Sequence, residues 1–103
     1  MDKAINGLIK SILNSKVYEN YAKELERIKK DPELKAKADE YRAKNYEIQT
    51  DKNIGFEQLE RFEREYSSIR DNEVVADFLA AELDLCRLIQ EIQLKITEAM
   101  QFE

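Results

Sequence analysis

The spacing of apolar residues along the chain predicts helices from its beginning. In residues 1–30, apolar side chains recur every three or four positions, which is the period of one helix face. The row is interrupted at Asn14-Ser15, where Ser15 can cap a second helix, and Asp2 is a plausible cap for the first. Gly7 weakens the first helix. The pattern therefore leaves open whether this region forms one bent helix or two.

The tripeptide Asp-Pro-Glu at residues 31–33 marks the clearest boundary in the chain. Proline is tolerated at the first position of a helix, aspartate caps well, and glutamate favours the positive N-terminal end of the helix dipole. We therefore expect a third helix to begin here, with a narrow apolar stripe, and to extend beyond the core before it ends near Gly55. A fourth helix should run from Phe56 to about Arg70.

The last helix, capped by Asp71 or Asn72, carries the longest apolar pattern in the chain. At 100° per residue, its apolar side chains separate into two stripes. We expect a broad stripe to face the core: Val74, Phe78, Ala81, Leu85, Leu88, Ile89, Ile92, Ile96 and Met100. The second stripe, on roughly the opposite side, is a candidate interface: Ala76, Leu79, Leu83, Cys86 and Leu94. Two stripes predict either a central helix or a helix shared with another chain.

These patterns together predict an all-α fold, because the period-two alternation of strands is absent from the sequence. We expect a small bundle of about five helices with a long C-terminal helix, forming a single domain over residues 1–103. A domain of this size buries only about two-thirds of its unfolded surface. We therefore expect the bundle to be completed by oligomerisation, as a dimer or a higher assembly.

The composition argues against most catalytic chemistry. The chain has no histidine and a single cysteine, Cys86, so it offers no histidine base, no intrachain disulfide and no cysteine cage for a metal. Carboxylates are abundant, but they lie among arginines at spacings of three and four, which is typical of surface ion pairs. We therefore expect no catalytic residues, no metal site, no cofactor and no enzyme activity.

Nucleic-acid binding is the main alternative from another functional class. The formal net charge of −5 argues against it, although residues 16–44 carry nine basic and seven acidic side chains. Aromatic residues in this region could stack on bases. However, Tyr18, Tyr21 and Tyr41 fall on apolar stripes and are predicted to be core, whereas Tyr46 is off the stripe. We expect no direct contact with nucleic acid, and an RNA-binding module using residues 16–44 remains the alternative.

The N-terminus shows no targeting signal. The residues after Met1 lack the apolar run of a signal peptide, and no stretch approaches the roughly 18 to 20 apolar residues of a membrane span. Charged residues make up 38% of the chain, which also argues against a membrane protein. We expect a cytoplasmic protein that does not associate with membranes.

Several short motifs resemble the YlbF/YmcA family of small helical bacterial regulators. The first half matches through Val17-Tyr18-Glu19-Asn20-Tyr21, Asp31-Pro32-Glu33-Leu34, Tyr41-Arg42, Gln49 and Gly55. The second half matches through Asn72-Glu73-Val74-Val75-Ala76-Asp77-Phe78, Ala81-Glu82, Leu85, Leu88 and Ile92. The similarity spans nearly the whole chain, and it rests on the shared order of these motifs.

The resemblance implies a helical fold with a long terminal helix, and oligomers formed with identical or related helical family members. It also implies a non-enzymatic role as a cofactor of messenger-RNA processing that influences competence, sporulation and biofilm formation. Some family members carry a cysteine-bearing tail linked to iron–sulfur clusters, but this sequence ends at Glu103 and Cys86 does not map onto those ligands. We therefore expect an adaptor that acts by protein–protein contact. A purely structural oligomeric scaffold is a further alternative.

Overall fold

The computed structural model describes residues 1–101, and all of its regular secondary structure within this range is α-helical. The five helices confirm the predicted fold class, including a last helix of 28 residues. Their bounds are α1 Asp2–Leu13, α2 Lys16–Lys29, α3 Pro32–Thr50, α4 Phe56–Arg70 and α5 Glu73–Met100.

Side-chain caps fix most of the helix starts. Ser15 accepts a hydrogen bond of 3.2 Å from the backbone N–H of Tyr18, so residues 1–30 form two helices and not one. Asp31 caps α3 and Asn72 caps α5 through equivalent bonds, each to the backbone N–H three residues further on. The expected cap at Asp2 is wrong, because α1 begins at this residue and its N-cap position is Met1.

The end of α3 also differs from the sequence expectation. The helix stops at Thr50, and residues 51–55 form the connection to α4, so α3 is about one turn shorter than predicted. Asp51 accepts a hydrogen bond of 2.9 Å from the backbone N–H of Asn53, a local turn that competes with helix continuation.

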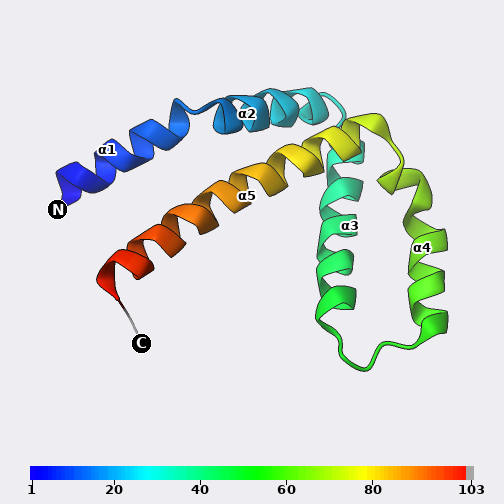
Figure 1. Ribbon diagram of the computed structural model, residues 1–103. Coiled ribbons are helices and arrows are strands. Elements are labelled where there is room, and N and C mark those ends of the chain that lie inside the picture. Colours follow the sequence, from blue (N-terminus) through cyan, green and yellow to red (C-terminus); the bar gives the residue numbers. More distant parts are fainter. Residues whose placement is uncertain (102–103) are drawn as a thin grey trace.

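The helices form two arms that meet at a corner (Figure 1). In the first arm, α5 runs back alongside α2, and α1 continues α2 toward the free end. In the second arm, α3 and α4 form an antiparallel hairpin that points away from the corner. The shape is flat and open, with extents of 48 × 39 × 17 Å and a radius of gyration of 17.3 Å.

The core lies at the corner, where α2, α3 and α5 meet. Ile28, Ala38, Val75 and Phe78 are almost completely buried there. The first half of the predicted core stripe is thereby confirmed at Phe78 and Ala81, which are both 1% exposed. Val75 belonged to neither predicted stripe, yet it is fully buried, because helices on two sides cover the beginning of α5.

The far half of the predicted core stripe is not covered by the chain. Ile89, Ile96 and Met100 are 41%, 51% and 61% exposed, so their assignment to the core of a single chain is wrong. These residues are exposed because α2, with 14 residues, is too short to cover the whole of α5, which has 28. Within residues 1–101, α1 continues α2 end to end (Figure 1) and its backbone makes no contact with that of α5, so it does not extend the cover.

Side-chain contacts hold the helices of each arm together, through ion pairs in the first arm and through aromatic rings in the hairpin. Arg27 of α2 donates a hydrogen bond of 2.8 Å to Asp77 of α5 and one of 3.2 Å to Glu24, whose side chain is nearly buried. These two carboxylates raise the pKa of Arg27. In the hairpin, the rings of Tyr41, Phe62 and Tyr66 form an aromatic cluster with centroid distances from 5.1 to 5.9 Å.

Candidate docking groove

A groove of about 650 Å³ lies on the inner side of the corner, between α3 and α5. Its surface is predominantly apolar, and it is open to solvent. The residues that line it come from one face of each helix: Tyr41, Arg42, Asn45, Tyr46, Gln49, Leu79, Ala80, Glu82, Leu83, Cys86 and Gln90. We call this surface the α3–α5 groove.

The floor of the α3–α5 groove is formed by the second stripe of α5. Leu79, Leu83 and Cys86 follow one another at spacings of four and three, which places them on one helix face. Leu79 is half-buried and packs against the core, whereas Leu83 is 49% exposed and Cys86 is also exposed. The groove thus has an apolar floor that is anchored in the core at one end and accessible at the other.

Three of the five predicted interface residues therefore come together in the groove. Ala76 and Leu94 are exposed on α5 but do not line it, and Leu94 is 56% exposed. That any of these residues contacts another protein remains a prediction. The exposure of Leu83 and Leu94 agrees with the inference that one chain leaves the second stripe uncovered.

The wall contributed by α3 was not predicted from the sequence as part of the site. Tyr46 is 70% exposed, as expected from its off-stripe position, and it stands on the groove side of α3. Asn45 and Gln49 lie one turn apart on the same face, and the Gln49 amide donates a hydrogen bond of 3.4 Å to Asn45. Their amide groups give the rim donors and acceptors without net charge.

One ion pair crosses the groove between its two helices. Arg42 of α3 pairs with Glu82 of α5, and it also pairs with Asp39 at 2.9 Å. The hydrogen bond to Glu82 raises the pKa of Arg42. Because both charged residues that line the groove pair with each other, the surface offered to a ligand is apolar and amide-rich. This chemistry suits a protein surface better than a phosphate backbone.

The basic region at residues 16–44 is largely occupied by contacts within the chain. Five of its nine basic side chains form ion pairs with nearby carboxylates: Arg27, Lys35, Lys37, Arg42 and Lys44. Tyr21 packs against Phe78 with a centroid distance of 6.1 Å, and Tyr41 stacks on Phe62 at 5.7 Å. The expectation that these tyrosines serve packing is therefore confirmed.

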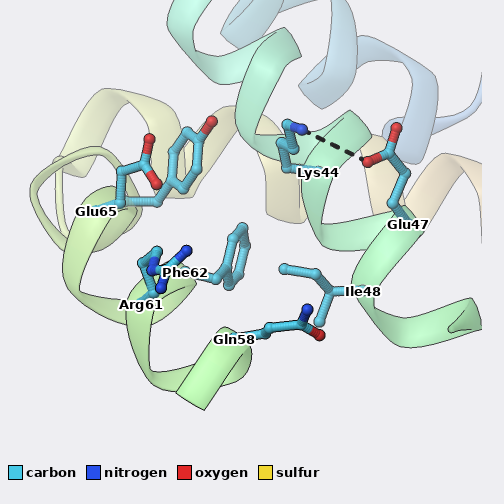
Figure 2. A pocket seen from close by; sticks show the side chains of 8 residues that line it. Lys44, Glu47, Ile48, Gln58, Arg61, Phe62 and Glu65 are labelled. Atoms are coloured by element: carbon cyan, nitrogen blue, oxygen red, sulfur yellow. Dashed lines mark ion pairs between the residues drawn. The ribbon is translucent and has the colours of Figure 1, made fainter. Parts of the chain in front are cut away.

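A second hollow, of about 250 Å³, lies between α3 and α4 (Figure 2). Phe62 of α4 and Ile48 of α3 meet inside it, next to an ion pair of 3.7 Å between Lys44 and Glu47. This hollow is smaller than the α3–α5 groove and is bordered mainly by charged and amide side chains. It contains none of the predicted interface residues, and its shape follows from the spacing of the hairpin helices.

The fold and the groove define a class of small all-helical protein with an open, two-armed shape and an exposed apolar surface at its corner. Comparison with protein families gives the more specific assignment. The chain belongs to the family described as "Control of competence regulator ComK, YlbF/YmcA", whose family model matches residues 1–101. This description indicates a regulatory role. No curated protein and no solved structure gave a significant match.

A helix that crosses a bilayer must be both long and apolar. Among residues 1–101, no helix combines the length and the apolar composition of a membrane span. Even α5, which is long enough at 28 residues, carries charged residues along its length, including Asp84, Arg87, Glu91 and Lys95.

Proposed function

We propose that this chain is a non-enzymatic regulatory adaptor that binds other helical proteins through the α3–α5 groove. The observation that carries the proposal is the accessible apolar floor, where Leu83 and Cys86 are exposed between the two arms and Tyr46 stands beside them. Tyrosine is one of the residues enriched at the energetic centres of protein interfaces, and the contacts around such a centre exclude water.

The shape of the groove favours an amphipathic helix as the bound segment. Leu79, Leu83 and Cys86 form a row of apolar residues along one face of α5, with polar residues beside it. Helix-in-groove recognition places the apolar face of an amphipathic helix on a surface of this kind. The uncharged rim at Asn45, Gln49 and Gln90 can bond to polar groups along the edge of such a helix. Family membership supports the regulatory part of the proposal. We extend it to regulated messenger-RNA processing, carried out together with related family members.

The decisive experiment compares two variants of α5 that introduce the same charge. Leu83→Glu places a carboxylate on the groove floor, whereas Gln93→Glu places one at an exposed position outside the groove. The partners should first be identified by affinity capture with the wild-type chain, and the dissociation constant should then be measured with purified proteins. We expect Leu83→Glu to weaken binding by roughly 30-fold or more, because the interface would have to bury an unpaired charge.

Circular dichroism provides the folding control for both variants. Both changes lie at exposed positions, so the helix content should match that of the wild type. If Leu83→Glu folds normally and binds every captured partner as tightly as Gln93→Glu does, the groove is not the docking surface. Tight binding of single-stranded RNA at low salt that is abolished by high salt would instead favour the nucleic-acid alternative.

A further inference from the structure

The side of α3 that faces α5 carries polar side chains along most of its length. Lys35, Asp39, Arg42, Tyr46 and Gln49 follow one another at spacings of four and three, which places them on one helix face. The outer part of this face, from Arg42 onward, forms a wall of the α3–α5 groove, and its inner part lies at the corner. Apolar packing therefore accounts for little of the contact between these two helices.

Apolar contacts hold α3 to the core only near the corner. Ala38 is completely buried and Leu34 packs against the same core cluster, whereas within residues 1–101 no α3 residue beyond Ala38 belongs to it. Residues 30–31 connect α2 to α3 and residues 71–72 connect α4 to α5, so the hairpin joins the first arm at a single place (Figure 1). A hairpin attached in this way can change its angle to the first arm unless another contact restrains it.

A chain of charged side chains supplies such a contact. Asp39 accepts hydrogen bonds from Lys35 at 2.6 Å and from Arg42 at 2.9 Å. Arg42 also pairs with Glu82 of α5 across the groove. At the other end of the chain, Lys35 Nζ lies 5.5 Å from the centroid of the Phe78 ring, which is within the range of a cation–π contact. We call the four charged residues the α3–α5 brace: Lys35, Asp39, Arg42 and Glu82.

Both ends of the α3–α5 brace rest on well-packed parts of α5. Phe78 is buried in the core, and the side chain of Glu82 is only 21% exposed. Within residues 1–101, Arg42–Glu82 is the only ion pair that joins α3 to α5. Charges that are linked in a network contribute more than isolated surface pairs, so the brace can restrain the hairpin although Arg42 is partly exposed.

The angle between the arms determines what the α3–α5 groove can hold. An amphipathic helix seated there must contact α3 and α5 at the same time. Packed helices keep their axes roughly 8–10 Å apart, so the groove accepts such a helix only over a narrow range of widths. Because α3 and α5 diverge from the corner, a change in the angle between the arms changes the width of the groove (Figure 1).

We propose that Arg42 is a positioning residue that fixes the angle between the two arms, and with it the width of the α3–α5 groove. It acts through Glu82, while Asp39 holds its guanidinium group in place. The floor of the groove is uncharged, yet its distance from the wall depends on ion pairs and therefore responds to ionic strength. The consequence for docking rests on the function proposed above, whereas the control of the angle does not.

Distances measured by double electron–electron resonance in the full chain test the proposal. One nitroxide label is attached to the native Cys86, which is exposed on α5, and the other to Thr50→Cys at the end of α3. Labelled chains are diluted into an excess of unlabelled Cys86→Ser chains, so that distances between copies do not contribute. Arg42→Glu should lengthen the mean distance by a few ångström and broaden its distribution, because three carboxylates then lie together. Adding Glu82→Arg to Arg42→Glu should restore the wild-type distance.

The matched control is Arg64→Glu, which makes the same charge change and breaks the ion pair of 3.3 Å between Arg64 and Glu60. This pair lies within α4 alone, so the distance between the labels should not change. In the wild type, salt at roughly 1 M, where the Debye length is about 3 Å, should lengthen the distance as Arg42→Glu does, and this comparison needs no folded variant of Arg42.

Three results would each overturn the proposal: a distance unchanged by Arg42→Glu or by high salt, an equal shift in Arg64→Glu, or no recovery with Glu82→Arg. The docking function is judged separately, by the binding of Leu83→Glu. Weak binding by that variant together with an unchanged distance in Arg42→Glu would keep the docking surface and remove only the positioning role of Arg42.

Discussion

The hydroxyl group of Tyr66 in α4 donates a hydrogen bond of 2.8 Å to the carboxylate of Glu40 in α3. This hydrogen bond lies beside the aromatic cluster of Tyr41, Phe62 and Tyr66. Together the hydrogen bond and the cluster hold α3 and α4 against each other outside the buried core at the corner. The carboxylate, helped by the burial of the ring, raises the pKa of Tyr66 from its ordinary value of 10.0 to about 12. The stability of the hairpin should therefore respond to pH in an unusual, alkaline window.

Replacing Tyr66 by Phe should reveal this dependence. At neutral pH, Tyr66→Phe should lower the free energy of unfolding by about 1–2 kcal/mol, because a hydrogen bond to a charged acceptor is lost while the ring is kept. The folded pKa lies above the unfolded one, so the contribution of the hydroxyl is complete below about pH 10 and is lost as the pH rises toward 12. Thermal melts of both proteins should show a difference that shrinks across this window. A difference that stays constant up to pH 12 would contradict the assignment.

Two phenylalanines provide a matched test of where the core lies. Phe78 is 1% exposed at the corner, whereas Phe56 at the start of α4 is 79% exposed. Phe78→Ala should cost about 3–5 kcal/mol, which is a large part of the stability of a domain of this size. Phe56→Ala should change the free energy of unfolding by less than about 0.5 kcal/mol. Urea titrations followed by circular dichroism will measure both, and similar losses for the two variants would place the core elsewhere.

The cap of α5 can be tested in the same way. Asn72 accepts a hydrogen bond of 3.2 Å from the backbone N–H of Val75, at the start of α5, the helix that contacts α2, α3 and α4. Asn72→Ala should lower the free energy of unfolding by about 1 kcal/mol, since an N–H group at the helix start loses its partner. Asn20→Ala, at an exposed position inside α2, is the control and should be neutral or slightly stabilising. Equal effects at the two positions would mean that Asn72 does not act as a cap.

Local features of the fold were predictable from the sequence because their signals are themselves local. Ser15, Asp31 and Asn72 each bond to a backbone group three residues away, so their roles as caps follow from sequence order alone. The end of α3 was less predictable, because the choice between another helical turn and the Asp51 turn involves small free-energy differences.

Features that depend on the packing of distant helices could be predicted only in part. The periodicity of α5 identified both stripes but could not show where along the helix its cover ends, so Ile96 was assigned to the core and Val75 was missed. The floor of the groove follows from the second stripe. Its wall, with Tyr46 and Gln49, depends on the way α3 crosses α5, and that arrangement is set by the buried corner.

The incomplete cover of α5 also bears on how long a copy of this protein survives in the cell. A single chain displays exposed apolar side chains on α5 and a first helix, α1, none of whose residues is buried. Exposed apolar surface and weakly packed segments are features that chaperones and proteases recognise. We expect assembly with another chain to hide these features and to slow turnover by mass action. We therefore expect the cellular level of this chain to follow the supply of molecules it can assemble with. Surplus copies would be degraded, and a fixed stoichiometry would be maintained without a dedicated sensor.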